Sequence, residues 1–318
     1  MKSRRCFCIF ALAYFIGASS FSQIQNGKYV FQNETVLVAY SAHVFKDVDL
    51  ADARAVSSLL LQEILDNWAL NLGNRVVIYE DMNMLKRDIR DDVIDIIALT
   101  TPEYFMLRTQ IKIIPFLTYM LSDRILDRML LITRKDSRIK SVNGLKGRKI
   151  AVYSNLSDEF NLPSLWFTTL VLRNGGNYRA DYASTVYKVR KGTNAISDVF
   201  FNNADAAVIP EMEFNIAKEL NPQIGVQLGI IDSSRQMLYS VLCYTDKLTT
   251  AMARYKDRNL QSISDLLCNA NKTDVGRHFL SIFRITSFVP YQSAYLNETE
   301  KLFNDFRILS ADHNRRSK

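Results

Sequence analysis

Segments with the apolar pattern of β-strands alternate with segments that have the pattern of α-helices from Glu34 onwards, and this alternation limits the possible folds most strongly. Strand patterns lie at 35–40, 76–79 and 94–99. Between the first two, apolar residues at helical spacing predict one long helix that ends at Gly73. Strands that alternate with helices are typical of parallel βαβ units, so we predict an α/β fold.

A second unit of the same kind begins near Arg148. Its expected strands are 149–153, 185–189 and 206–209, and its expected helices are 163–173, 194–202 and 212–220. Long apolar runs at 129–133 and 238–244 bracket this unit. If both runs cross between two lobes, the second unit is inserted into a discontinuous first one, and the crossings form a hinge around a cleft. We therefore expect two mostly parallel sheets: an outer lobe of residues 34–128 plus 245–318, and an inserted lobe of residues 135–237.

The first 22 residues have the pattern of a secretory signal peptide. Lys2, Arg4 and Arg5 precede an apolar run that ends among small residues, with cleavage expected after Ser20 or Ser22. The alternative is a membrane anchor, but the run is shorter than the roughly 20 residues that span a bilayer. We expect a mature chain exported to the periplasm, with a formal charge of +4 instead of +7. Its two cysteines, Cys243 and Cys268, are equally compatible with a disulfide and with buried thiols.

Polar residues follow three of the predicted strands at the point where each strand ends. In an open α/β sheet, ligands bind beyond the carboxyl ends of strands, where helix N-termini present N–H groups. Any one of these stretches could simply be a helix cap or a turn. Three at equivalent places in facing lobes predict the floor of a polar cleft. The candidate residues are Tyr40, Ser41, Thr100, Thr101, Tyr104, Ser154, Asn155 and Ser157.

Several stretches carry a resemblance to a known family. Residues 141–154, "SVNGLKGRKIAVYS", resemble the segment that opens the second lobe of type II periplasmic solute-binding proteins. The stretches "DVIDIIALTTPEY" (92–104), "VFFNNADAAVI" (199–209) and "RITSFVPYQSAY" (284–295) resemble the phosphate/phosphite/phosphonate-binding branch associated with ABC transporters. The likeness extends from about Val36 to Phe306. It implies the two-lobed type II fold and a small-molecule ligand held between the lobes.

The resemblance also implies which residues bind the ligand. The family binds its anionic group at a hydroxyl-rich turn between strand and helix, which here corresponds to Ser154, Asn155 and Ser157. Tyr104 matches a tyrosine that commonly lines the pocket, and Glu211 lies next to the position of an expected acid. Asp158 and Glu159 stand in the same turn, where negative charge would repel an anion. The ligand is therefore either a small oxyanion or a zwitterion whose amine meets Glu211 or Asp158.

The sequence contains no catalytic constellation that we can identify. None of the three histidines has the spacing of a metal site, and neither a P-loop nor a G-x-S-x-G motif is present. No interleaving of basic and aromatic residues indicates nucleic-acid binding. We expect a monomeric solute-binding protein without metal or cofactor, which delivers its ligand to an ABC permease. The alternatives are a sensing module for a separate membrane receptor or kinase, and an enzyme built on the same fold.

Overall fold

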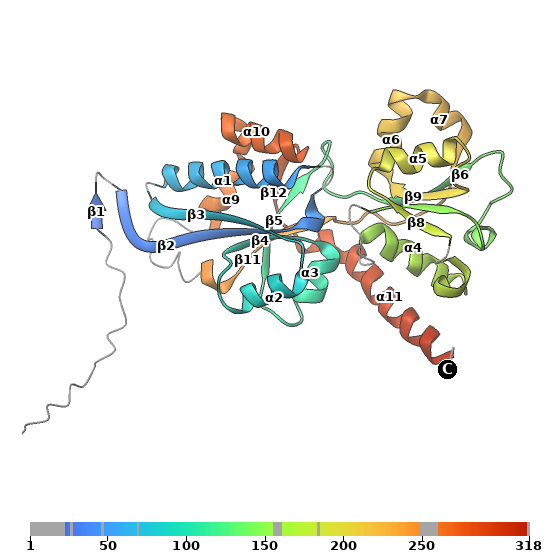
Figure 1. Cartoon of the computed structure of the whole chain (residues 1–318), viewed down its shortest axis with the longest axis horizontal. Coiled ribbons are helices and arrows are strands. Elements are labelled where there is room, and N and C mark those ends of the chain that lie inside the picture. The colour runs from blue at the N-terminus through green and yellow to red at the C-terminus, as the bar shows by residue number, and fades with distance from the viewer. Residues whose placement is uncertain are drawn as a thin grey trace, which may run out of the picture.

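The computed structural model describes residues 23–25, 28–45, 48–68, 70–154, 161–182, 185–248 and 260–316. The predicted signal peptide, Asn155, Ser157, Asp158 and Glu159 lie outside these residues. Two lobes lie side by side, and each is a β-sheet flanked by helices (Figure 1). The predicted two-lobed α/β architecture is therefore confirmed.

The larger lobe contains a sheet of seven described strands. Six of them follow the order β1-β2-β4-β11-β5-β12, and β3 pairs with β2. Their bounds are β1 Gln23–Gln25, β2 Lys28–Ser41, β3 Leu70–Tyr79, β4 Ile96–Thr100, β5 Ile114–Met120, β11 Ser240–Tyr244 and β12 Ser287–Pro290. The helices of this lobe are α1 Leu50–Asn67, α2 Met82–Arg90, α3 Thr101–Leu107, α9 Leu260–Cys268 and α10 Asp274–Phe283.

The smaller lobe contains a sheet of five described strands in the order β10-β6-β9-β7-β8. Their bounds are β6 Met129–Arg134, β7 Ile150–Tyr153, β8 Val186–Val189, β9 Ala206–Pro210 and β10 Leu228–Ser233. The helices here are α4 Leu162–Arg173, α5 Gly192–Phe200, α6 Glu211–Leu220 and α7 Pro222–Gln227. Pro163 lies within the first turn of α4, where its missing N–H is of no consequence.

Both sheets are mixed, so the expectation of mostly parallel sheets holds only for part of each. Strand β2 is parallel to β3 and β4, and β7 is parallel to β8 and β9. The remaining pairs, which include β11 with β4 and β6 with β9, are antiparallel. The antiparallel strands β6 and β11 each come directly after a segment that connects the two lobes. Each strand therefore begins at the end of its sheet that faces the other lobe.

The chain passes between the lobes twice, once from β5 to β6 and once from β10 to β11. Asp127 and Met237 form an isolated antiparallel bridge between these two segments. Most of each apolar run that was expected to cross lies instead within a sheet, as β6 and β11, and only Leu238 and Tyr239 of the second run precede β11. Burial explains the difference, because the residues of β6 and β11 are almost fully buried and belong to the two cores.

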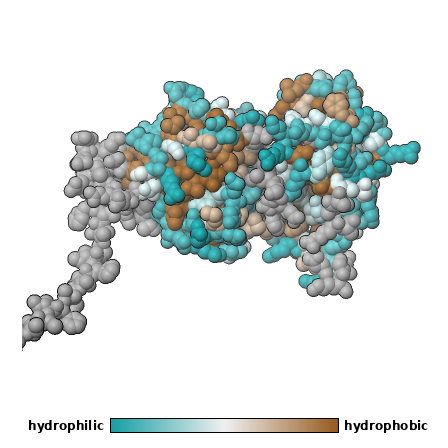
Figure 2. Space-filling model, in the orientation of Figure 1, coloured by the Kyte–Doolittle hydropathy of each residue, from teal (hydrophilic) through white to brown (hydrophobic). Residues whose placement is uncertain are grey.

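Each sheet separates two hydrophobic clusters, as the alternation of side chains along a strand requires. In β2, Val38 and Tyr40 face α1 and α10, whereas Leu37 and Ala39 face α2 and α3. In β7, Ile150 and Val152 pack towards α4, and Ala151 and Tyr153 pack towards α5 and α6. A band of hydrophobic side chains is visible on the larger lobe in Figure 2.

The predicted end of the first helix at Gly73 is wrong. Helix α1 ends at Asn67, and β3 has begun by Leu70. Apolar residues continue through this boundary, so periodicity alone did not reveal the change from helix to strand. Gly73 instead pairs with Thr35 of β2, and a Cβ at this position would lie 2.7 Å from the Thr35 Oγ1 atom. The glycine therefore permits the close approach of two strands.

The last helix, α11 Asn297–Arg316, contacts both lobes. Leu302 belongs to the core of the smaller lobe, and Phe303 packs against the cores of both. Ion pairs join Arg108 of α3 to Glu300 and Arg173 of α4 to Asp305. In Figure 1 the helix extends from the junction along α4. The assignment of residues 245–318 to the outer lobe stays a prediction.

Candidate ligand-binding site

Two predicted site residues of the larger lobe converge on one buried carboxylate. Glu103 is 2% exposed, and its Oε1 atom lies 2.5 Å from both the Ser41 hydroxyl and His43 Nδ1. Its Oε2 atom accepts from the Thr100 backbone N–H at 2.8 Å and from the Thr100 hydroxyl at 2.9 Å. The Glu103 carboxyl group is therefore in contact with one ring nitrogen, two hydroxyl groups and one backbone N–H group. These contacts tie the ends of β2 and β4 together.

The local sequence explains this arrangement. Thr100 is the N-cap of α3 and forms a capping box with Glu103, the pattern T-x-x-E at 100–103. Ser41 caps the short 3-10 helix Ala42–Val44, which brings His43 back towards the strand end. Strands β2 and β4 are parallel neighbours, so their carboxyl ends meet at the same edge of the sheet.

Three other predicted site residues of the larger lobe have their side chains engaged elsewhere. Thr101 is fully buried, and its hydroxyl donates to the Leu238 carbonyl oxygen at 2.7 Å. Tyr104 is 8% exposed and packs against Phe105 in the hydrophobic cluster between the sheet and α2 and α3. Tyr40 faces the opposite side of β2 and packs against Phe45 and Phe283. These three do not share the position of Ser41 and Thr100.

In the smaller lobe, Ser154 and Glu211 follow the neighbouring parallel strands β7 and β9. Ser154 is 2% exposed, and its hydroxyl accepts from the Asn161 side-chain amide at 2.9 Å. Asn161 caps α4, because its side-chain oxygen accepts from the Ser164 backbone N–H at 3.0 Å. This contact connects the end of β7 to the start of α4 on either side of residues 155–160.

Glu211 forms ion pairs with two arginines that were not among the predicted site residues. Its Oε2 atom lies 3.2 Å from Arg128 Nε and 3.4 Å from Arg124 Nη1. Both arginines come from the first crossing segment, and Glu211 opens α6 of the smaller lobe. The stretch "SDRILDR" at 122–128, with its two basic residues four apart, was the available signal.

Asp127, from the same crossing segment, caps α6. It is 6% exposed, and its carboxylate accepts from the backbone N–H groups of Arg128 at 2.8 Å and Met212 at 3.3 Å. A carboxylate at the first turn of a helix is favoured by the free N–H groups and by the helix dipole. Asp127 therefore fixes the crossing segment against the smaller lobe.

Tyrosines from both lobes meet beside this segment. Tyr239 lies in the second crossing segment, close to Tyr119 of β5 and Tyr153 of β7. Burial, together with the negative charge of Asp127, raises the pKa of the Tyr239 phenol well above its ordinary value. Tyr239 therefore remains a neutral hydrogen-bonding group at any physiological pH. None of these three tyrosines was predicted as a site residue.

A small pocket lies at this junction in the described part of the chain. Its volume is about 10 Å³, and its lining includes Tyr119, Arg124, Asp127, Met212 and Tyr239. That volume is about enough for one water molecule. The lining combines one guanidinium group, two phenols and the Asp127 carboxylate with apolar side chains such as Leu126 and Leu238.

No three of the described histidine, cysteine, aspartate and glutamate side chains are grouped so that they could hold a metal ion. No helix among the described residues is both long and apolar enough to span a bilayer. Cys243 is buried and Cys268 half-buried, and they do not form a disulfide with each other.

Comparison with known proteins identifies the family. The model of the periplasmic substrate-binding proteins of phosphonate ABC transporters matches residues 61–296, which is most of the chain. A comparison with curated proteins finds no significant match. Proteins of this family bind small anionic ligands in the periplasm and deliver them to an ABC permease.

Solved structures with the same fold have low sequence identity to this chain. The XAC2383 protein of Xanthomonas citri, solved with bound ATP, is 14% identical with a TM-score of 0.63, over 87% of this chain and 98% of that one. PhnD1 of Prochlorococcus marinus, in complex with methylphosphonate, is 12% identical with a TM-score of 0.60, over 86% and 98%. The aliphatic sulphonate-binding protein SsuA of Escherichia coli is 12% identical with a TM-score of 0.50, over 87% and 94%. With its type II fold and its family match, this chain belongs to the periplasmic substrate-binding proteins of phosphonate ABC transporters, and it is a solute-binding protein, not an enzyme.

Proposed function

We propose that this protein captures a small phosphonate-like oxyanion at the junction of its lobes, between the crossing segments. One observation carries the proposal: Arg124 and Arg128 share the single carboxylate of Glu211. The Asp127 carboxylate of the same segment balances the second guanidinium charge, so the proposal rests on the position of the guanidinium N–H groups and not on an excess of charge. Guanidinium groups match the geometry of phosphonate oxygens and form strong charge-assisted hydrogen bonds with them.

The same observation favours one of the two ligand classes that the sequence left open. A zwitterion would need a carboxylate to receive its amine, and the predicted candidates were Glu211 and Asp158, of which only Glu211 lies within the described residues. Its charge is already balanced by arginines at 3.2 and 3.4 Å. A third cation placed there would be repelled by both guanidinium groups. We therefore favour an oxyanion over an amine-bearing ligand.

The remaining predicted residues receive two kinds of role in this proposal. Ser154, Asn155 and Ser157 provide hydrogen-bond donors from the turn after β7, as the family resemblance implies. Ser41 and Thr100 act indirectly, because both donate to Glu103 and thereby position the edge of the larger lobe. Tyr239 and Tyr153 supply phenol groups at the junction.

Methylphosphonate is the first ligand to test, since the PhnD1 structure of similar fold contains it. Isothermal titration calorimetry should compare methylphosphonate, inorganic phosphate and a zwitterionic aminophosphonate. We expect methylphosphonate or phosphate to bind, and the aminophosphonate to bind more weakly. A saturating ligand at 100 times its dissociation constant should also raise the free energy of unfolding by about 2.7 kcal/mol.

The decisive variant is Arg128→Gln, and Arg148→Gln is its matched control. Arg148 is an exposed arginine of the smaller lobe, and it pairs with Asp205 at 3.8 Å. Loss of one charge-assisted hydrogen bond should weaken binding about 10- to 100-fold in Arg128→Gln, whereas Arg148→Gln should bind like the wild type. Equal affinities of all three proteins would overturn the proposal, as would tighter binding of the aminophosphonate.

We also propose that the protein acts as a monomer in the periplasm, released by cleavage after Ser20 or Ser22, and that it binds no nucleic acid. The apolar run at 6–21 after three basic residues supports the cleavage. The intact mass of protein isolated from a periplasmic fraction gives the cleavage site, and light scattering of the same sample gives the oligomeric state. A mass that includes the first 20 residues, or a dimer at micromolar concentration, would contradict this part.

A further inference from the structure

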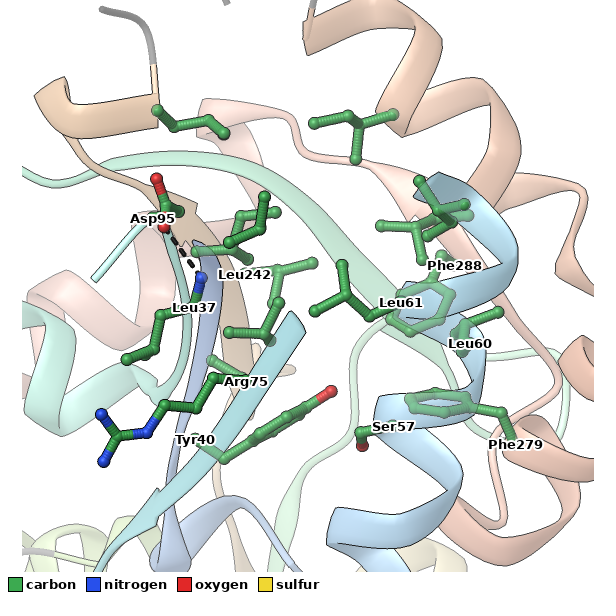
Figure 3. Close-up of a pocket in the computed structure, with 18 of the residues that line it drawn as sticks. Leu37, Tyr40, Ser57, Leu60, Leu61, Arg75, Asp95, Leu242, Phe279 and Phe288 are labelled. Atoms are coloured by element: carbon green, nitrogen blue, oxygen red, sulfur yellow. Dashed lines mark hydrogen bonds between the residues drawn. The ribbon is translucent and has the colours of Figure 1, made fainter. Parts of the chain in front are cut away.

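The larger lobe contains a cavity of about 780 Å³. It lies between the sheet and the helices α1, α9 and α10, and Figure 3 shows its lining. Protein interiors leave few voids larger than one water molecule, whereas small-molecule sites occupy roughly 300–1,000 Å³. The size of this cavity is that of a ligand site rather than of a packing defect.

The lining of the cavity is mainly apolar. Aliphatic and aromatic side chains from both the sheet and the helices face it, and they include Val38, Leu61, Ile64, Leu242, Phe279 and Phe288. Water in such a space would find few hydrogen-bond partners, and apolar cavities of this kind accept apolar molecules. The pocket at the junction is far smaller, and Arg124, Asp127 and two tyrosines contribute to its otherwise mainly apolar lining.

Two hydroxyl groups interrupt the apolar lining. Ser57 of α1 is 4% exposed, and its Oγ atom has no hydrogen-bond partner among the described residues. The hydroxyl of Tyr40 points towards the same space and lies near Ser57 (Figure 3). Burial raises the pKa of Tyr40 to about 12, so its phenol remains protonated. A buried hydroxyl without a partner is unfavourable, and a ligand with one polar group would satisfy it.

The charged residues at the edge of the cavity are engaged with one another. Asp95 accepts from the Leu37 backbone N–H at 2.9 Å and from Lys247 Nζ at 2.5 Å. Asp246 pairs with Lys112 at 2.8 Å. The guanidinium group of Arg75 points away from Ser57 (Figure 3). Among the described residues, the hydroxyl pair therefore lies apart from Arg75 and Lys247, the two cations that line the cavity, and an uncharged occupant fits best.

We propose that this cavity is a second ligand site, which takes an uncharged lipophilic molecule with one hydrogen-bonding group that reaches Ser57 and Tyr40. The apolar part of the ligand fills the space between α1 and the sheet. The cavity adjoins the junction pocket, with which it shares Thr118, Tyr119, Leu121 and Ser240. Its two polar contacts, Ser57 and Tyr40, do not line that pocket, so we expect the two ligands not to compete.

The fluorescent probe N-phenyl-1-naphthylamine tests the proposal, because it is uncharged, apolar and carries one N–H group. We expect a saturable rise in its emission with the wild-type protein at a ratio of one to one. Ser57→Phe places a ring inside the cavity and should weaken binding at least tenfold. The matched control is Leu59→Phe, two residues away on α1, at a side chain that is 56% exposed; its affinity should equal that of the wild type.

Two further measurements complete the test. Ser57→Ala removes the hydroxyl without adding volume, so it keeps the test decisive if Ser57→Phe does not fold; loss of one hydrogen bond should weaken the probe about two- to tenfold. Saturation with methylphosphonate should leave the affinity for the probe unchanged. Three outcomes would each overturn the proposal. They are no saturable binding of the probe to the wild type, a probe affinity of both serine variants equal to that of the wild type, and competition between methylphosphonate and the probe.

Discussion

At the scale of single residues, Glu103 is the centre of the polar edge of the larger lobe. Four donors from Ser41, His43 and Thr100 surround a carboxylate that is almost completely buried. A buried charge is tolerated only when its hydrogen bonds are made, and here both oxygens receive two. The hydroxyls of Ser41 and Thr100 therefore donate their hydrogen bonds to Glu103, and their role in this structure is to hold that side chain in place.

Replacing this carboxylate by its amide should destabilise the protein. In Glu103→Gln, the amide NH₂ group would face donors on one side, so at least one pair of hydrogen bonds is lost. We expect the free energy of unfolding in urea to fall by about 1.5–3 kcal/mol. Glu219→Gln, at an exposed glutamate of α6, should change it by less than about 0.5 kcal/mol. If the Glu103→Gln protein is as stable as the wild type, the contacts of Glu103 with Ser41, His43 and Thr100 do not stabilise the larger lobe.

Tyr40 should make the stability of the protein sensitive to alkaline pH. Burial raises its pKa from 10.0 to about 12, so folding favours the neutral phenol. This contribution is complete below pH 10 and is lost as the pH rises from 10 to 12. By pH 11 the loss should be about 1.4 kcal/mol. Denaturation at pH 9 and 11 should show a smaller decrease for Tyr40→Phe than for the wild type; equal decreases would contradict the prediction.

At the scale of elements, close backbone contacts and caps decide where helices begin and how they pack. Helix α10 starts at the N-cap Thr273, whose hydroxyl accepts from the Gly276 N–H at 3.0 Å. A Cβ on Gly276 would lie only 1.9 Å from the carbonyl oxygen of Ala270. The first turn of α10 and the 3-10 helix Ala270–Lys272 therefore pack backbone against backbone.

Gly276→Ala should force these two elements apart. Overpacking of this kind typically costs about 1–3 kcal/mol, and we expect the upper end because the obstructing atom belongs to the backbone. Gly144→Ala is the matched control, since an added Cβ there would lie no closer than 3.7 Å to a neighbour. Thermal unfolding should separate the two variants clearly. A melting temperature of Gly276→Ala within one degree of the control would contradict the packing described here.

At the scale of the whole molecule, three segments join the lobes. Two are the crossing segments, held together by the bridge between Asp127 and Met237. The third is α11, which pairs with Arg108 of the larger lobe and Arg173 of the smaller one. Two crossings allow a hinge motion, and a helix bound to both lobes limits its direction.

Ligand binding at the junction should bring the lobes together. We expect the radius of gyration from small-angle X-ray scattering to fall when methylphosphonate saturates the wild-type protein. Arg128→Gln at the same ligand concentration should keep the larger radius, because its affinity is lower. If calorimetry shows binding and the radius stays constant, the lobes do not close over the ligand.

Local pattern was sufficient for much of the fold. Helices α4 and α6 begin within one residue of their expected positions and end where expected, and the predicted α/β class and two-lobed architecture are confirmed. The pattern T-x-x-E at 100–103 marks a helix start from sequence alone. Periodicity gave the wrong end for the first helix, because one apolar run, Trp68 to Leu72, continues from helix to strand. It also did not distinguish buried strands of a sheet from segments that cross between the lobes.

Strand and helix identity followed from the sequence because each depends on the spacing of neighbouring residues. The site depended on the tertiary structure, because its contacts join residues far apart in the chain. Ser41 meets Glu103 only because β2 and β4 are adjacent, and Arg128 meets Glu211 only because the crossing segment lies against α6. Tyr40, one residue from Ser41, faces an apolar cavity because successive side chains of a strand point to opposite faces of the sheet.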